Sequence, residues 1–389
     1  MTEKVKGFND YTGEDAEKRA FIKKLLIETF EKYGFQPAET PIIEYEKVVK
    51  GDNVNDGAIS DIFKLRDKGK RNLALRYEFT FQLKRLMQNK KLPYKRYQIG
   101  PVFRDEPVSA NRFRQLTQCD VDCIGSNEKS EAEILAIVKT VLSSLGIKFE
   151  INVNNRELLN EIFQEQGIKN KEAVLREIDK LDKLSEKEIK SNLKKYKAEN
   201  ILNILKKPEA YFEKYAMYTE IKKLKQYCKL YNVNINFQAN LARGLSYYNG
   251  NVFEVKVNGM AETLCGGGSY MFNKIQSTGI SFGLERLSSL IKVKSNKEKY
   301  LIASLNQDKE SIKIANMLRK QNKETNIYYG KPSKALEYAN AYNINNVIFV
   351  GAEEIKKKKF KIKDMETGKE KYVTFEKRTK KNVILRKKK

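Results

Sequence analysis

Residues 97–125 read YQIGPVFRDEPVSANRFRQLTQCDVDCIG, a pattern typical of a β-hairpin. Both ends are rich in β-branched and aromatic residues, whereas the middle is polar and contains one proline. We therefore expect two antiparallel strands joined by a loop. Arg104 and Glu106 end the first strand, and Arg112 and Arg114 begin the second. Three guanidiniums are then expected together at the open end of the hairpin.

Such a group of arginines suits a polyphosphate, because guanidinium is planar, permanently charged and bidentate toward phosphate oxygens. Alternate residues of the second strand share one face, which predicts a polar floor beside the phosphate site. Its members are Arg112, Arg114, Gln118, Asp120 and Asp122. A charged hairpin can also be a solvated sheet edge, and the pattern alone does not choose between the two interpretations.

The composition limits the chemistry. The chain has 389 residues, enough for more than one domain, and its 40% hydrophobic content indicates a globular protein. A net charge of +26 favours a polyanionic partner, although lysine-rich codon usage would also raise it. Histidine is absent, which excludes Ser-His-Asp and Cys-His mechanisms. An enzyme of this composition must orient its reactants and stabilise charge.

The cysteines argue against a metal site. Cys119, Cys123, Cys228 and Cys265 show no paired metal-ligand spacing, so we expect buried thiols and no bound structural metal. The chain shows no signal peptide and no apolar run of membrane-spanning length. We therefore expect a cytoplasmic protein with reduced thiols and no membrane contact.

The residues before the central hairpin predict a helix, an interrupted strand and a second hairpin. Apolar residues recur at helical spacing over 14–32. Residues 35–43 read as a strand interrupted by Pro37 and Pro41. Because proline belongs at a sheet edge or an interface, this helix and strand form a candidate dimerisation element. Residues 62–75 predict two short strands around a turn.

Glu78 and Thr80 lie where this second hairpin leads into a predicted helix at 81–88. Side chains at such strand-to-helix junctions commonly project into a site. Thr80 taken by itself would equally suit an ordinary helix N-cap.

Beyond the central hairpin, the pattern predicts a helical insert and a separate C-terminal domain. Helical periodicity covers 129–145 and a lysine- and glutamate-rich insert at about 156–224. The charged face of the insert is either solvated surface or a nucleic-acid contact. Later, strands and helices alternate, which predicts a compact α/β unit with a mixed or parallel sheet. We expect the domains at 1–296 and 297–389.

Three glycine-rich segments lie between the insert and this boundary. Residues 241–255 read LARGLSYYNGNVFEV and residues 264–270 read LCGGGSY. We interpret both as strands that meet glycine turns, where the backbone approaches a ligand closely. Residues 279–287, GISFGLERL, pass from a strand into a helix carrying Arg286. One glycine triplet is a weak signal, but three such segments favour a binding site.

Together these segments resemble a histidyl-tRNA synthetase, a class II aminoacyl-tRNA synthetase, over nearly the whole chain. TPIIE, FRDE with RFR, and GISFGLERL resemble the three class II motifs. RGLSYYNG resembles the histidine motif of the family, commonly RGLDYYTG, and LCGGGSY resembles its companion glycine motif. The implied fold is an α+β catalytic core, an antiparallel sheet flanked by helices. A helical insert and a C-terminal α/β anticodon-binding domain complete it.

The resemblance implies a ligase that converts histidine and ATP to histidyl-adenylate and pyrophosphate, then transfers histidine to the 3′ end of tRNA(His). The implied substrates and partners are L-histidine, ATP with Mg²⁺, and tRNA(His), without DNA. The first motif, with Pro41, implies a homodimer. Arg243 and Arg104 are implied to be catalytic at the α-phosphate. The implied ATP-binding residues are Arg104, Glu106, Arg112 and Arg286.

The resemblance also implies a histidine pocket. Its implied residues are Glu78, Thr80, Gln118, Asp122, Tyr247, Tyr248 and Gly267. Glu78 and Thr80 would hold the α-amino group, while Asp122 and Tyr248 would receive the imidazole. A carboxylate pairs well with a ring N–H, and a hydroxyl with the other nitrogen. Such a site rejects other side chains, because they leave buried polar groups unpaired.

The chain departs from the family pattern at several positions. Ser246 stands where Asp is commoner, and Ser269 and Met271 stand where the glycine motif usually continues Arg-Tyr-Asp. The loop PVSAN lacks the basic and Gln residues that in many members read the extra 5′ nucleotide of this tRNA. Two alternatives remain: a histidine-binding regulatory subunit of ATP phosphoribosyltransferase, and a basic RNA-binding module. The retained arginines and the C-terminal domain favour the ligase.

Overall fold

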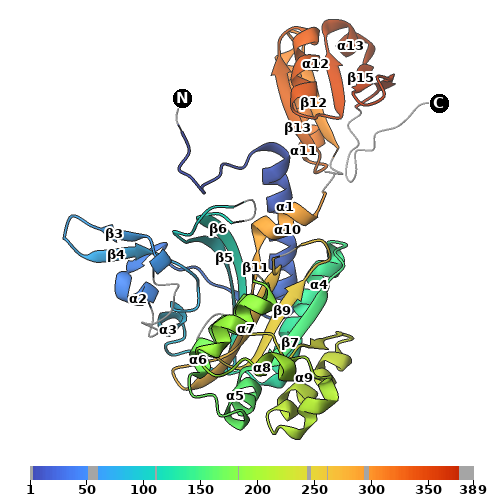
Figure 1. Ribbon diagram of the computed structural model, residues 1–389. Coiled ribbons are helices and arrows are strands. Elements are labelled where there is room, and N and C mark those ends of the chain that lie inside the picture. Colours follow the sequence, from blue (N-terminus) through green and yellow to red (C-terminus); the bar gives the residue numbers. More distant parts are fainter. Residues whose placement is uncertain are drawn as a thin grey trace. The chain divides into compact units, whose positions relative to one another are not determined.

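The computed structural model describes residues 3–50, 60–109, 112–182, 184–242, 247–260, 262–292 and 298–375. The chain forms two compact units, Met1–Lys292 and Val293–Lys389 (Figure 1). The described part of the chain contains no helix that is long and apolar enough to cross a membrane.

The first unit is built on an eight-stranded sheet in the order β1-β5-β6-β11-β10-β9-β7-β8. All neighbours are antiparallel except the parallel pairs β1/β5 and β7/β8. The strands are β1 (Gln36–Pro37), β5 (Tyr94–Phe103), β6 (Gln115–Ile124), β7 (Glu150–Asn155), β8 (Asn236–Phe237), β9 (Tyr248–Lys256), β10 (Cys265–Phe272) and β11 (Ile275–Gly283).

The predicted central hairpin is confirmed, because β5 and β6 pair along their whole length, from Tyr94 opposite Ile124 to Phe103 opposite Gln115. The second strand begins at Gln115, later than expected. Arg112 and Arg114 therefore precede β6 and do not lie in the strand.

The two faces of this sheet differ in character. Helices α1 (Gly13–Lys32) and α4 (Glu128–Ser144), which confirm the predictions at 14–32 and 129–145, pack against one face. Phe30 of α1 contacts the rings of Tyr97 and Phe282 there. Tyr97 and Phe282 alternate along their strands with polar side chains, which point to the opposite face of the sheet. The helices therefore cover the apolar face and not the polar one.

A three-stranded sheet in the order β2-β4-β3 extends the N-terminal part of this unit. It consists of β2 (Ile43–Tyr45), β3 (Lys64–Arg66) and β4 (Asn72–Leu75), with helices α2 (Glu46–Lys50) and α3 (Leu83–Leu86) beside it in the chain. The strand expected at 35–43 is split between β1 and β2, because Pro37 and Pro41 cannot donate to a ladder. The helix expected at 81–88 is shortened to α3.

The predicted helical insert is confirmed and runs a few residues beyond its expected end. It comprises α5 (Arg156–Glu165), α6 (Lys171–Ile178), α7 (Glu186–Lys194), α8 (Ile201–Leu205) and α9 (Tyr218–Leu230), drawn in green in Figure 1. Short 3₁₀ helices at Asp179–Asp182 and Glu209–Lys214 connect them.

The second unit is a five-stranded mixed sheet in the order β13-β12-β14-β15-β16. Its strands are β12 (Lys299–Ser304), β13 (Glu324–Tyr329), β14 (Asn346–Val350), β15 (Phe360–Asp364) and β16 (Glu370–Val373). Strands β13, β12 and β14 are parallel, as the α/β alternation predicts. Strands β15 and β16 form an antiparallel hairpin that was not predicted, and β15 is also antiparallel to β14. Helices α11 (Asp308–Arg319), α12 (Pro332–Ala341) and α13 (Ala352–Lys357) accompany the sheet.

Candidate active site

The candidate site lies on the polar face of the large sheet. Arg96 and Gln98 of β5 pair with Asp122 and Asp120 of β6. Cross-strand partners share a face, so these four side chains lie together, and all are buried. The alternation predicted for Gln118, Asp120 and Asp122 is therefore observed. Burial raises the pKa of Asp120 to about 6.

Gln118 connects an arginine to this acidic floor. Nη2 of Arg104 donates to Oε1 of Gln118 at 2.9 Å, and Nε2 of Gln118 donates to Asp120 at 3.1 Å and to Oγ of Ser281 at 3.0 Å. The Arg104 guanidinium also lies 4.5 Å above the ring of Tyr77. Arg104, just beyond β5, is thus held in place with part of its surface open to a ligand.

The other charged residues of the hairpin are less enclosed. The Tyr77 hydroxyl donates to Glu106 at 3.5 Å, and Nη2 of Arg114 pairs with Asp105 at 3.1 Å. Arg112 is exposed and its backbone bridges to Ser109. Arg104 and Arg114 are adjacent, joined by a 2.8 Å backbone hydrogen bond. Of the charged residues expected at this end of the hairpin, Arg104 alone hydrogen-bonds to the polar floor, through Gln118.

Glu78 adds a third buried carboxylate. Its Oε1 accepts a hydrogen bond from the backbone N–H of Phe81 at 2.8 Å. Burial raises the pKa of Glu78 to about 7, and a hydrogen bond from Thr80 opposes that shift. The N-cap residue of α3 is Gln82, so the interpretation of Thr80 as an ordinary N-cap is wrong. Thr80 instead supports Glu78.

Three tyrosines form an aromatic wall beside these carboxylates. The ring of Tyr247 lies 4.9 Å from that of Tyr248 and 5.7 Å from that of Tyr270. The Tyr270 hydroxyl donates to Oδ1 of Asp122 at 2.7 Å. Sequence reasoning missed Tyr270, although the motif LCGGGSY contains it.

The glycine triplet lies inside β10, paired on both sides, so the prediction of a glycine turn there is wrong. A Cβ at Gly267 would lie 2.0 Å from the carbonyl oxygen of Gly279, which means that close contact of β10 with β11 requires this glycine. A Cβ at Gly279 would lie 2.1 Å from Oδ1 of Asp122, so Gly279 makes room for that carboxylate.

Helix α10 (Leu284–Leu290) brings Arg286 to the end of β11, as predicted. Nη1 of Arg286 donates to the carbonyl of Thr263. The preceding residue, Glu285, accepts hydrogen bonds from the backbone N–H of Thr117 at 3.0 and 3.1 Å and pairs with Arg19 at 3.0 Å. A cavity of about 180 Å³ beside them is lined by Arg19, Glu285 and Arg286, among others.

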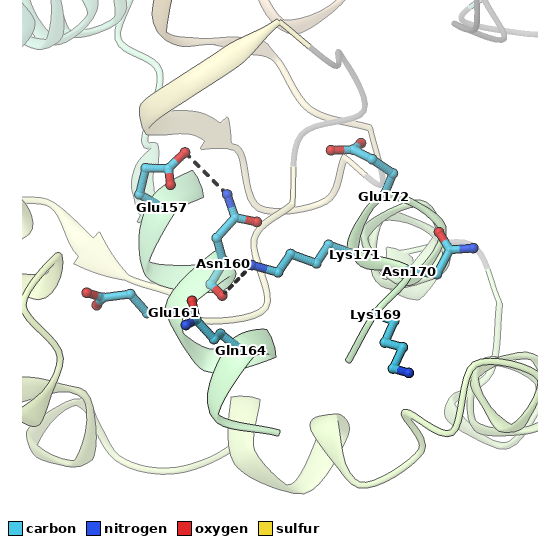
Figure 2. Close-up of a pocket in the computed structure, with 8 residues that line it drawn as sticks. All are labelled: Glu157, Asn160, Glu161, Gln164, Lys169, Asn170, Lys171 and Glu172. Atoms are coloured by element: carbon cyan, nitrogen blue, oxygen red, sulfur yellow. Dashed lines mark hydrogen bonds between the residues drawn. The ribbon is translucent and has the colours of Figure 1, made fainter. Parts of the chain in front are cut away.

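A larger cavity, of about 480 Å³, lies in the helical insert (Figure 2). Lys171 reaches across it and donates to the carbonyl of Asn160 at 3.3 Å, and the Asn160 amide donates to Glu157 at 3.2 Å. All of its lining side chains are polar or charged and come from α5, from α6 or from the residues between them. None of them was predicted as a site residue.

The family model for histidyl-tRNA synthetase matches residues 7–287, and the anticodon binding domain model matches residues 291–382. The chain belongs to the histidyl-tRNA synthetase family. Histidine–tRNA ligase 2 of Shouchella clausii is 32% identical over 415 residues, covering 95% of this chain and 98% of the relative. Histidine–tRNA ligase of Wolinella succinogenes is 31% identical, covering 94% of each chain.

Solved structures show the same fold. A histidyl-tRNA synthetase from Nostoc superposes with a TM-score of 0.83 at 22% identity, covering 96% of each chain. A protein of Bacillus halodurans described as an ATP phosphoribosyltransferase regulatory subunit/histidyl-tRNA synthetase gives 0.77 at 20% identity, covering 90% of this chain and 98% of its own. The class II fold of the histidyl-tRNA synthetase family, with its C-terminal domain, is therefore confirmed.

Two of the positions discussed above for this histidyl-tRNA synthetase family member, Arg243 and Ser246, lie outside the described residues. Pro41 is exposed and precedes β2, and its neighbour Thr40 accepts a hydrogen bond from Gln98 at 2.8 Å. The four cysteines are buried and free, as predicted.

Proposed function

We propose that this chain is a histidine–tRNA ligase. It activates histidine with ATP, giving histidyl-adenylate and pyrophosphate, and transfers the histidyl group to the 3′ end of tRNA(His). The observation that carries the proposal is the link from Arg104 through Gln118 to Asp120. An anion-binding group and a buried acidic pocket are thereby held side by side, as a reaction between a phosphate and an ammonium-bearing substrate requires.

Charge supports histidine as the occupant of the pocket. Glu78, Asp120 and Asp122 surround one buried cation, Arg96, so the pocket has an excess of negative charge. An α-ammonium group offsets that excess, and we assign it to Glu78 and Thr80, with Gln118 beside it. Asp122 and Tyr248 take the imidazole, while Tyr247 and Gly267 shape the wall.

The phosphates of ATP are assigned to arginines. Arg104 holds the α-phosphate, Arg112 and Arg286 hold the outer phosphates, and Glu106 lies at the adenine. Arg243 neutralises charge that develops at the α-phosphorus during in-line attack by the histidine carboxylate. These side chains act by orientation and charge alone, in keeping with a chain that contains no histidine.

Mg²⁺ would be brought with ATP. In nucleotide sites this ion is held largely by phosphate oxygens, with one or two carboxylates. Among the residues that the structure describes, no group of three or more Cys, Asp or Glu side chains is placed to hold a metal by itself. That arrangement fits a substrate-borne ion.

The proposal includes a homodimer formed through the element around Pro41. Ile42, Ile43 and Tyr45 of this element are 42%, 50% and 47% exposed. Such a group of exposed apolar side chains is typical of an interface. Sedimentation velocity of the wild type and of Ile43→Lys tests it: the substitution should dissociate a dimer, and a wild-type monomer would contradict it. A cytoplasmic location, where tRNA is charged, belongs to the same proposal.

Histidine-dependent exchange of labelled pyrophosphate into ATP tests the activity, measured on the wild type and on Arg243→Ala. We expect exchange with histidine and a loss of about 100-fold or more in the variant, because a partner of the transition-state charge is removed. Absence of exchange from a wild type that still binds histidine would favour the regulatory-subunit alternative. Absence of both, with tRNA binding retained, would favour an RNA-binding module.

A further inference from the structure

Arg96 is the largest fully buried side chain among the residues that the structure describes, at 0% exposure. Its Nη2 lies 2.9 Å from Oδ2 of Asp122 and donates to the carbonyl of Phe79 at 3.3 Å. Its Nε and Nη1 have no hydrogen-bond partner among the described residues. Burying a guanidinium so incompletely paired is costly, and an apolar pair of similar volume is often at least as stable. Stability therefore does not account for Arg96.

Asp122 is fixed from three strands. Arg96 approaches Oδ2 from β5, and the Tyr270 hydroxyl donates to Oδ1 from β10. Gly279 of β11 lies so close that any Cβ there would meet Oδ1 at 2.1 Å. A cation beside one oxygen and a hydrogen-bond donor at the other favour the ionised form of this carboxylate, which only accepts hydrogen bonds.

The charges facing this pair come from several elements. Asp120 of β6, Glu78 from the turn before α3 and Tyr270 of β10 interact with Arg96, in addition to Asp122. The pKa of Asp122 is raised on balance, because burial raises it by more than Arg96 and the Tyr270 hydrogen bond lower it. Arg96 is thus the one described cation among three buried carboxylates. Without it, Asp122 would take up a proton and would present an O–H donor to part of its surroundings.

We propose that Arg96 is a positioning residue for histidine specificity, because it holds Asp122 as an acceptor-only partner for a ring N–H of the substrate. The inference rests on the proposed function and deepens it. An ionised acceptor in a fixed position favours a substrate side chain that donates a hydrogen bond at that point. An apolar side chain of similar size leaves the carboxylate unpaired, which a buried site penalises strongly.

The test compares Arg96→Gln with the wild type in histidine-dependent pyrophosphate exchange over pH 6 to 9. A matched control is Arg156→Gln, since Arg156 is also buried and paired, with Glu172 at 2.8 Å, but lies in the insert. We expect kcat/KM for histidine to fall about 10- to 100-fold in Arg96→Gln, with KM for ATP unchanged. Arg156→Gln should leave both values unchanged.

The pH profile separates this role from a merely structural one. The ratio of variant to wild-type kcat/KM cancels the titration of the substrate imidazole. It should rise with pH for Arg96→Gln, because Asp122 and the two other carboxylates that interact with Arg96, Asp120 and Glu78, regain their charge as the solution becomes more basic. Arg96→Lys retains a cation and should restore a flat ratio.

Several results would overturn the inference: an unchanged KM for histidine, an equal rise of both KM values, or a flat ratio for Arg96→Gln. If that variant does not fold, Tyr270→Phe removes the hydrogen bond that Asp122 accepts and should give a ratio that rises in the same direction; a flat ratio there would overturn the inference equally. A wild type without histidine-dependent exchange would refute the proposed function itself, whereas an active wild type with an indifferent Arg96 refutes this inference alone.

Discussion

At the scale of the residue, alternation along β5 and β6 separates structure from chemistry. Tyr97 turns to the helices, and Arg96 and Gln98 on either side of it turn to the polar face. Another acid, Glu131 of α4, is buried against the same sheet and accepts hydrogen bonds from Asn251 of β9 at 2.7 Å and from Ser269 of β10. Ser269 stands at a position where the family usually has an arginine. Both hydrogen bonds to the buried Glu131 therefore come from neutral side chains.

This environment predicts a pH-dependent stability. Burial raises the pKa of Glu131 from its ordinary 4.5 to about 7. The folded state therefore binds one more proton than the unfolded state between these values, and stability falls as the pH rises through that window. Glu131→Gln mimics the protonated acid and does not titrate. We expect its free energy of unfolding, relative to wild type, to increase by about 3 kcal/mol from pH 4.5 to pH 7.

Denaturant unfolding of both proteins at several pH values measures this difference. Well above pH 7 the difference should become constant, because Glu131 is then charged in both the folded and the unfolded state. A difference that is the same at pH 4.5 and pH 7 would show that Glu131 keeps an ordinary pKa in the folded protein.

At the scale of the element, three segments distant in the sequence fix the start of α10. Arg19 of α1 donates to Oγ1 of Thr117 at 2.9 Å and pairs with Glu285, which in turn binds the backbone of Thr117. The Arg19 guanidinium also lies 3.8 Å above the ring of Tyr11. The network fastens α10, and hence Arg286, to the strand that carries Gln118.

Loss of Arg19 should therefore weaken ATP binding more than histidine binding. For Arg19→Met we expect KM for ATP to rise about tenfold, because a buried ion pair that holds the helix loses one partner. KM for histidine should change less than twofold. Lys24→Met, on the exposed side of the same helix, is the control. Pyrophosphate exchange with each substrate varied in turn measures both constants, and equal effects on the two would contradict this role.

At the scale of the whole molecule, the two compact units have separate cores. The second unit buries one apolar cluster around Ile314 and Leu318 of α11 and another around Ala335 and Ala339 of α12. The polar floor belongs wholly to the first unit. We expect residues 1–292 alone to retain histidine-dependent pyrophosphate exchange and to lose most transfer of histidine to tRNA(His). Loss of exchange in a folded fragment would show that the active site needs the second unit.

Much of this fold could be predicted because it follows from local patterns in the sequence. The β5–β6 hairpin follows from a period of two, and the insert follows from helical periodicity. The strand β10 was misread at its glycines, because residues without side chains show no strand pattern. Arg19 and Tyr270 were missed because their partners are remote; Tyr270 and Asp122 are 148 residues apart. Arg96 was missed although its partner Asp122 lies opposite it in the same hairpin. Only the alternation along β5, which puts Arg96 on the same face as Gln98, could have indicated its position.

On this proposal the buried acidic pocket selects histidine for activation. Pyrophosphate exchange by the intact chain, measured separately with each of the twenty standard amino acids, tests that selection. We predict exchange with histidine and a rate at least about 1,000-fold lower with every other amino acid, as expected when wrong side chains leave buried polar groups unpaired. Exchange with another amino acid at a comparable rate, or with none, would contradict the assignment of the pocket.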